Sequence, residues 1–245
     1  MPPYLSIVFP VYNEEAILKN NLLRVVRYLE QTGIDFEIIL VDDGSGDKTI
    51  DIAKDLIRND RRIKLLTLIK NRGKGGALKE GVMTSRGRII LFSDMDLSVS
   101  FDQLPTFLET LTNGYDLAIG SRKAPGAKVI VHQPFVRETL GRGFTFLSRI
   151  ILCLRVSDFT CGFKMFKAYT AKDLFSRMTL SDWSFDAELL YLSEQLGYRR
   201  IELPVVWNNR SETRVRLRKD LIASFLGLFR VKWRHRKIDR HGEST

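Results

Sequence analysis

Two aspartates stand one residue apart directly after an apolar run, and their spacing suits metal chemistry. The run is residues 89–92, and the carboxylates are Asp94 and Asp96. A short apolar run bounded by turn signals predicts a strand buried on both faces. Side chains at i and i+2 of an extended segment point the same way, so both carboxylates should face one point beyond the strand. Such oxygen donors suit Mg²⁺ or Mn²⁺, although an Asp-x-Asp turn without a ligand explains the pair equally well on its own.

Four other predicted strands also end in polar residues. Apolar strand-like runs alternate with segments of helical periodicity, which predicts an α/β fold with a doubly wound, mostly parallel, Rossmann-like sheet. Ligands bind such sheets outside the carboxyl ends of the strands. The polar ends are residues 10–14 after a strand at 5–11, Asp42 and Asp43 after 36–41, the turn 71–76 after 63–69, and residues 120–122 after 116–119. Isolated caps and turns explain this convergence poorly, so we expect a single crevice.

The glycine-rich turn Gly73-Lys74-Gly75-Gly76 is a candidate phosphate-binding element. It lacks the glycine spacing and the Lys-Ser/Thr ending of a P-loop, and it does not follow the first strand as a dinucleotide fingerprint would. What it can provide is a tight loop that opens a helix. Its amide groups and Lys74 could approach a diphosphate.

Length and composition describe a globular unit with an appended segment. The chain has 245 residues, of which 44% are hydrophobic, enough for a substantial core. Cys153 and Cys161 form no metal-ligand or disulfide pattern, so both should be structural thiols in a reducing compartment. We see no signal peptide, and no apolar run reaches the ~20 residues of a spanning helix. A cytoplasmic protein is therefore expected.

The net charge of +10 is concentrated near the C-terminus. Residues 210–240 hold 11 Lys/Arg against three acids, so this segment alone carries +8. Apolar residues recur at helical intervals between 217 and 229, with basic clusters at both ends, which predicts an amphipathic helix in a membrane interface. We expect a catalytic domain at 1–216 and a basic tail at 217–245 that docks on an anionic membrane, on its cytosolic face. The alternative is that the apolar stripe packs on the protein's own core.

Several motifs occur in the order seen in the family 2 inverting glycosyltransferases of GT-A fold, and the chain resembles that family from about residue 5 to 215. The motifs are PVYNE (10–14), VDDGS (41–45), NRGKGGA (71–77), DMD (94–96), GSR (120–122), DFTCGFK (158–164), WSFDAE (183–188) and ELPVVW (202–207). The later motifs resemble the branch that glycosylates dolichyl or polyprenyl phosphate. Within it, the glycine-rich turn is most similar to that of dolichyl-phosphate β-glucosyltransferases.

The resemblance implies roles for the strand ends in holding a nucleotide sugar. Pro10, Tyr12 and Glu14 would line the nucleotide-base pocket. Asp43, with Asp42 beside it, would hold the edge of the base.

The resemblance also implies how phosphate and metal are held. Lys74 would lie near the phosphates, Asp94 would contact ribose and metal, and Asp96 would be the direct metal ligand, with Mg²⁺ or Mn²⁺ as the ion. Related mannosyltransferases often place Gln two residues after the second Asp. Here the residue is Ser98, so water would complete the metal shell.

The acceptor phosphate is expected to meet arginines. Arg122 matches the arginine of the Gly-Ser-Arg motif, and Arg137 lies where a second phosphate-binding arginine is expected. The late Ser-Lys-Val motif of the family is Thr-Arg-Val here, so Arg214 keeps the charge in a different geometry. Asp186 and Glu188, where other members place a base, are expected on a helix face instead.

The implied reaction is transfer of a hexose, with glucose favoured, to dolichyl or polyprenyl phosphate with inversion. UDP-glucose is the favoured donor and GDP-mannose the alternative. A polyprenyl-phosphate mannosyltransferase, or a non-catalytic sugar-nucleotide-binding protein, would carry similar motifs. The basic tail alone would also suit nucleic acid, but no nucleic-acid-binding motif appears, so no such partner is expected. His132, His235 and His241 share no ligand spacing and should be exposed to solvent.

Overall fold

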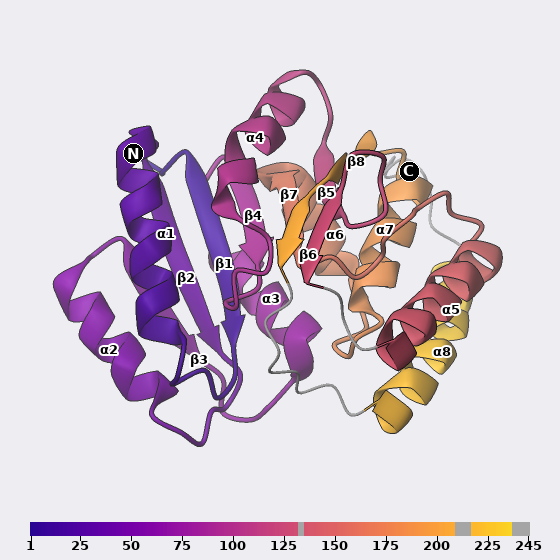
Figure 1. Cartoon of the computed structure of the whole chain (residues 1–245), viewed down its shortest axis with the longest axis horizontal. Helices are drawn as coiled ribbons and strands as arrows, with labels where there is room; N and C mark the ends of the chain where they lie inside the picture. The colour runs from indigo at the N-terminus through magenta and orange to yellow at the C-terminus, as the bar shows by residue number, and fades with distance from the viewer. Residues whose placement is uncertain (132–134, 209–216, 237–245) are drawn as a thin grey trace, which may run out of the picture.

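A seven-stranded sheet forms the centre of the molecule (Figure 1). The computed structural model describes the backbone of residues 1–131, 135–208 and 217–236, and the side chains of these residues except 135–137 and 217–224. The strand order is β3-β2-β1-β4-β7-β5-β8. The sheet strands are β1 (Leu5–Val11), β2 (Phe36–Asp42), β3 (Ile63–Thr67), β4 (Ile89–Ser93), β5 (Leu117–Ser121), β7 (Phe163–Lys167) and β8 (Arg200–Pro204). Only β7 runs antiparallel to its neighbours among these strands, so the predicted mostly parallel sheet is confirmed.

Helices cover both faces of the sheet, because alternate strand residues enter two separate cores. In β1, Ile7 and Phe9 belong to one core and Val8 to the other. The first core takes residues of α1 (Leu18–Thr32), α2 (Thr49–Asn59) and α4 (Leu104–Thr112), which follows the 3₁₀ turn η1 (Phe101–Gln103). The second takes residues of α3 (Gly73–Thr84), α6 (Ala168–Arg177) and α7 (Phe185–Gln195).

Two long helices, α5 (Phe135–Leu152) and α8 (Leu217–Arg234), lie side by side at one end of the second face (Figure 1). The ring centroids of Phe144 and Phe225 are 6.2 Å apart across their contact. Leu228 and Val231 of α8 are fully buried, so part of this helix packs on the body of the protein. Within the described chain, no helix has both the length and the apolarity to cross a bilayer.

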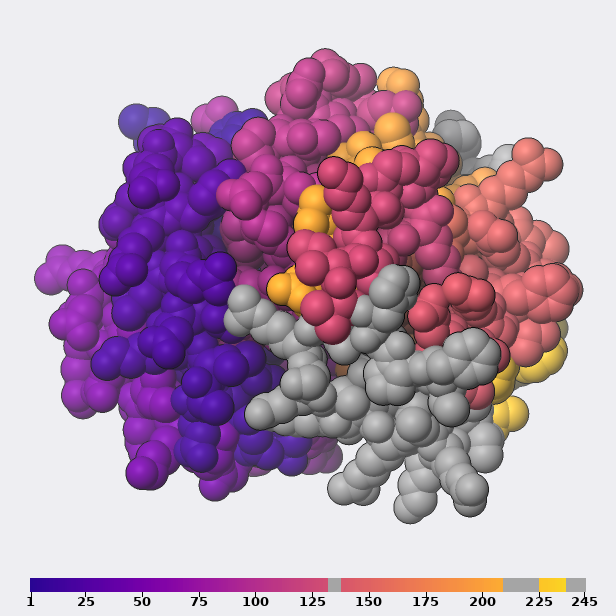
Figure 2. Space-filling model, viewed as in Figure 1, coloured from indigo at the N-terminus to yellow at the C-terminus, as the bar shows by residue number. Residues whose placement is uncertain are grey.

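A small parallel pair, β6 (Lys128–Val131) with β9 (Val206–Asn208), lies outside the main sheet. Figure 2 shows the same view with atoms filled in: the first half of the chain forms one side of the molecule and the later half the other. The carboxyl ends of β1, β2 and β4 thus come from the first half, and α5, α7 and α8 from the second.

Some element ends differ from the sequence prediction. The first helix begins only at Leu18, because residues 14–17, which follow the polar end of β1, form a turn. The third strand ends at Thr67 because its neighbour β2 ends opposite it, at Asp42. The second helix begins at Thr49, whose amide donates to the Asp47 carboxylate.

Gly81 marks the closest approach of α3 to the sheet and gives a stability prediction. A Cβ there would lie 2.4 Å from Val8 Cγ1 and 2.8 Å from Val41 Cγ2. Gly81→Ala should therefore lower the free energy of unfolding by about 1–3 kcal/mol, although alanine favours helix by about 1 kcal/mol. Gly143→Ala in α5 is the control, because its Cβ would meet nothing within 4 Å and should stabilise. Urea unfolding measures both, and an unchanged Gly81→Ala midpoint would contradict this packing.

Candidate active site

The crevice lies at the carboxyl ends of β1, β2 and β4. β1 pairs with β2 on one side and with β4 on the other, so the strand order reverses there, which is where open α/β sheets bind ligands. Direct contacts join the ends. After β1, the Asn13 amide donates to Ser45 Oγ beyond β2 over 2.8 Å, and the Gly46 amide donates to Asn13 Oδ1 over 2.7 Å. These contacts bring the predicted polar ends of β1 and β2 together.

The two metal-binding candidates lie in a turn. The strand ends at Ser93, so Asp94 and Asp96 are not on an extended segment, as their spacing had suggested. Burial, and then the charge of Asp94, raise the pKa of Asp96. Ser98 donates to Asp96 from its amide (2.9 Å) and its hydroxyl (2.8 Å). A Cβ at Gly162 would meet Asp94 Oδ2 at 1.9 Å, so glycine makes room for this carboxylate.

The carboxylate pair fits a hard divalent cation. Two aspartates supply oxygen donors, and the described residues hold no cluster of three or more His, Cys, Asp or Glu side chains that would complete a cage. Mg²⁺ characteristically uses one or two protein carboxylates together with substrate phosphates and water. Asp94 and Asp96 are therefore sufficient for a cation that a diphosphate also binds.

Lys74 lies against the same carboxylates. Its Nζ is 2.6 Å from Asp94 Oδ1 and 5.8 Å from the centre of the Trp183 ring. Burial alone would lower the pKa of Lys74, but the charges of Asp94, Asp186 and Asp96 outweigh it and raise that pKa. Lys74 is thus a fixed cation at the N-terminus of α3, where the sequence predicted a phosphate partner.

Asp43 ties the end of β2 to the glycine-rich turn. Its carboxylate accepts the amides of Arg72 (2.7 Å) and Gly73 (2.9 Å), while burial raises its pKa. Asp42 is fully buried and accepts the amides of Gly44 and Ser45 in the next turn. Both aspartates hold the backbone around the crevice, so any contact with a nucleotide base would add to these bonds.

The other predicted base-pocket residues lie at the end of β1. Pro10 is half-buried in the strand, opposite Val41, and Tyr12 is 40% exposed just after it. Glu14 is half-buried, and its amide donates to Thr49 Oγ1 over 2.7 Å. The structure thus puts the three residues along one rim, next to the Asp42–Asp43 turn.

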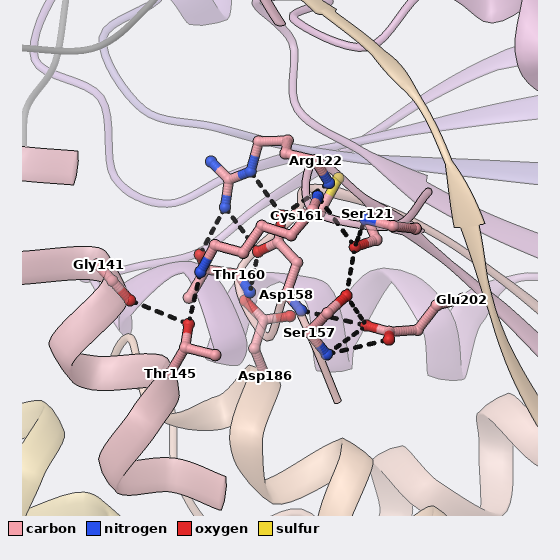
Figure 3. A network of polar contacts seen from close by, with 12 residues as sticks. Ser121, Arg122, Gly141, Thr145, Ser157, Asp158, Thr160, Cys161, Asp186 and Glu202 are labelled. Atoms are coloured by element: carbon pink, nitrogen blue, oxygen red, sulfur yellow. Dashed lines mark hydrogen bonds and ion pairs between the residues drawn. The ribbon is translucent and has the colours of Figure 1, made fainter. Parts of the chain in front are cut away.

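Arg122 is held by a network that begins on β8 (Figure 3). Its Nε and Nη2 donate to the two oxygens of Asp158 over 2.6 and 2.7 Å, and Nη2 also donates to Thr160. Glu202 accepts the Ser157 amide (2.8 Å) and the Asp158 amide (3.1 Å), which fixes the loop. Burial opposes ionisation of Asp158, but Arg122 outweighs it and lowers the pKa of Asp158 to about 2.

A second buried ion pair lies behind the metal-binding candidates. Lys164 and Asp186, both almost fully buried, are 2.5 Å apart, and Lys164 also donates to the Cys161 carbonyl. Burial raises the pKa of Asp186, while Lys164 and Lys74 act in the opposite direction. Asp186 does lie on a helix, as expected, and its charge is already met by a lysine.

α7 also contacts α8 next to the site. His235 Nε2 is 2.6 Å from Glu188 Oε1, and both side chains are buried, so the expectation that His235 is exposed was wrong. Its partner Glu188, which lies 47 residues earlier in the chain, explains the burial. A Cβ at Gly227 would lie 2.0 Å from Ser184 Oγ, directly before α7.

Two residues that were predicted to bind the acceptor phosphate, Arg137 and Arg214, have side chains outside the described part of the structure. The backbone of Arg137 belongs to the first turn of α5, but its side chain is outside the described residues, as is all of Arg214. The sequence analysis assigned no role to Asp158, Lys164 or Glu202, although all three lie within quoted motifs. A charged residue inside an apolar motif, as in DFTCGFK, was the available signal, because buried charges require partners.

The Asp158 pair predicts a pH-dependent stability. Asp158→Asn leaves Arg122 without its counter-charge and should lower the free energy of unfolding at pH 7 by roughly 2–4 kcal/mol. Because the folded pKa is depressed, this contribution is present above about pH 4 and is lost as pH falls towards 2. Urea unfolding from pH 7 to 2 should show that slope in wild type and a flatter one in the variant. Equal slopes would contradict the pairing.

Comparison with known proteins agrees with this architecture. A dolichyl-phosphate β-glucosyltransferase of Drosophila melanogaster is 37% identical over 216 residues, covering 83% of this chain and 66% of that protein, so the chain spans about two thirds of its length. The dolichyl-phosphate β-glucosyltransferase of Homo sapiens is 32% identical over 250 residues, covering 94% of this chain and 77% of that protein.

Solved structures share the fold. Glucosyl-3-phosphoglycerate synthase of Mycobacterium tuberculosis with UDP has a TM-score of 0.68 at 20% identity, covering 94% of this chain and 80% of that one. A mannosyltransferase of Pyrobaculum calidifontis with GDP-Man and Mn²⁺ has a TM-score of 0.65 at 18% identity, covering 98% and 66%. The GT-A fold expected from the motifs is confirmed. The model of glycosyl transferase family 2 matches residues 6–175, and the chain belongs to that family.

Proposed function

We propose that this protein transfers glucose from UDP-glucose to dolichyl or polyprenyl phosphate with inversion of the anomeric centre. The observation that carries the proposal is the division of charge in the crevice. Carboxylates suited to a metal lie beside Lys74 on one side, and Arg122 lies on the other. The names of several relatives at 29–37% identity, all dolichyl-phosphate β-glucosyltransferases, support the same reaction.

The donor side is suited to a nucleoside diphosphate. Asp94 and Asp96 would hold the divalent cation, Mg²⁺ or Mn²⁺, which neutralises the diphosphate leaving group when bound. Lys74 supplies a second, permanent charge at the N-terminus of α3, where backbone amides also favour phosphate. Pro10, Tyr12 and Glu14 would line the base pocket along the rim of β1.

The acceptor side lacks a free carboxylate base at the position of α7. Asp186 is engaged by Lys164 at 2.5 Å, and Glu188 accepts the amides of Thr179 and Leu180. A hydroxyl acceptor would need a base to remove its proton, whereas a phosphate monoester is already anionic. Arg122, which Asp158 fixes in place, can present its remaining guanidinium edge to that phosphate, and Arg137 and Arg214 are further candidates.

Attack by the acceptor oxygen in line with the leaving diphosphate would invert the anomeric carbon. An α-linked donor would then give a β-linked lipid-phosphate sugar. The chain's residues contribute by orientation and charge: Lys74 on the departing side, and Arg122 on the attacking side.

The proposal predicts a metal-dependent glucosyl transfer. Labelled UDP-glucose, Mg²⁺ or Mn²⁺ and a polyprenyl phosphate should yield a labelled lipid. Asp96→Asn should lower kcat roughly a hundredfold or more, since metal stabilisation is worth several kcal/mol. Asp51→Asn on the exposed side of α2 is the matched control and should keep full activity. A mannosyl lipid from GDP-mannose but none from UDP-glucose would show that the donor is wrong. Full activity in excess chelator would show that the metal is wrong.

We also propose that α8 docks the enzyme on an anionic membrane. The acceptor stays in the bilayer, so the active site must come to its headgroup. α5 and α8 pack against each other, and together they expose five apolar side chains, 52–67% exposed, that we call the apolar patch: Phe146 and Ile150 on α5, and Leu226, Phe229 and Trp233 on α8. Arg230, Lys232 and Arg234 are exposed between or beside them. Apolar side chains flanked by lysine and arginine suit the interface of an anionic membrane. The free thiols of Cys153 and Cys161 fit its cytosolic face.

Substitution of the patch tests this docking. The variant Leu226→Ser/Phe229→Ser/Trp233→Ser should bind vesicles containing phosphatidylserine at least about tenfold more weakly, because three exposed apolar side chains are lost from the contact. High salt should also weaken the binding of the wild-type protein to these vesicles, because salt screens the attraction between its basic residues and the anionic lipid. Met83→Ser, an exposed residue near the end of α3, is the control. Vesicle flotation that is equal for wild type and the triple variant would exclude α8 as the docking element.

A further inference from the structure

The lysine and arginine side chains around the crevice differ in whether a carboxylate lies beside them. Lys74 meets Asp94 at 2.6 Å, Lys164 meets Asp186 at 2.5 Å, and Arg122 meets Asp158 at 2.6 Å. Lys123, the next residue along the chain, differs from all three. Its Nζ donates to a neutral oxygen, Thr145 Oγ1, over 2.9 Å, and no carboxylate in the described part of the chain lies within ion-pair distance of it.

The surroundings of Lys123 carry an excess of positive charge. Burial lowers its pKa; Asp158 offsets part of this, and the charges of Arg122, Arg149 and Arg142 lower it further. Arg149 also uses a neutral partner, the Val156 carbonyl, and Arg142 pairs with Glu138 on its own helix. A cluster of like charges with so few counter-charges destabilises itself and attracts an anion.

The position of Lys123 joins this charge to the apolar patch. Lys123 follows β5, the strand whose end carries Arg122, and its partner Thr145 lies on α5. Thr145 is itself held, because its hydroxyl donates to the Gly141 carbonyl over 2.9 Å. Figure 3 shows the bond from Thr145 to Gly141 in the same view as the Arg122–Asp158 pair. One residue further along α5, Phe146 is 63% exposed in the apolar patch.

We propose that Lys123, positioned by Thr145, binds the phosphate of the acceptor and supplies the charge that Arg122 has already committed to Asp158. The ligand is a phosphate monoester dianion with an apolar chain, whose headgroup lies between β5 and α5 and whose chain leaves along the outer side of α5. This inference rests on the proposed function and names a residue that contacts the acceptor. Ammonium and guanidinium groups then hold different oxygens of one phosphate.

Activity and direct binding together test the role of Lys123. Lys123→Met should lower kcat/KM for polyprenyl phosphate at least about tenfold, as expected for one charge-assisted hydrogen bond. The Kd for UDP-glucose should stay within about twofold, because that site lies at β1, β2 and β4. Lys123→Arg should restore most of the loss. Lys54→Met on the exposed side of α2 removes the same charge far from the crevice and should behave as wild type.

Calorimetry with a short-chain prenyl phosphate, without donor, separates this inference from the proposed reaction. Lys123→Met should raise its Kd about tenfold, and inorganic phosphate should compete more weakly against the variant than against wild type. If inorganic phosphate binds at Lys123 as tightly as the prenyl phosphate, the site takes free phosphate and the lipid assignment is overturned. If Lys123→Met and Lys54→Met bind the prenyl phosphate equally, Lys123 has no role. Absence of any labelled lipid from wild type, with Lys123-dependent binding intact, would instead contradict the proposed function alone.

Discussion

Compensation of buried charge is the constraint that shapes this crevice. A charge removed from water must meet an opposite charge or hydrogen-bond partners, or it destabilises the fold by several kcal/mol. Three ion pairs meet that requirement, and each joins two separate elements. Lys74–Asp94 joins α3 to the turn after β4, Lys164–Asp186 joins β7 to α7, and Arg122–Asp158 joins the end of β5 to the loop before β7. The positions of the strand ends are therefore fixed by electrostatics as well as by the hydrogen bonds of the sheet.

Local patterns in the sequence were sufficient for the architecture. Alternation of apolar runs and helical segments predicted the parallel sheet, because each strand of such a sheet is buried on both faces and each crossover needs a helix. The polar strand ends predicted the crevice, and Asp43, Lys74 and Asp94 are joined there as expected. These signals lie within a few residues of each other, so a single sequence contains them.

Pairings across long separations were beyond the sequence alone. Nothing near Asp158 indicates that Glu202 fixes its loop, and nothing near His235 indicates that Glu188 makes its burial possible. The turn geometry of Asp94 and Asp96 was also missed, because their spacing suits an extended strand equally well. Such errors arise where tertiary contacts, rather than local periodicity, decide the conformation.

The close contact of Gly227 with Ser184 makes α8 part of the wall behind the catalytic crevice. On one side of the segment 181–186, the Ser181 carbonyl accepts the Gly75 amide beside Lys74. On the other side, α8 rests on Ser184, and His235 holds Glu188 one turn further along α7. Deleting the tail would remove the partner of a buried carboxylate as well as the proposed membrane-binding surface. If a protein without the tail lost activity, the loss could come from the disturbed contact between α7 and α8. Substitutions of exposed residues on α8 leave that contact intact, so they test the proposed membrane attachment alone.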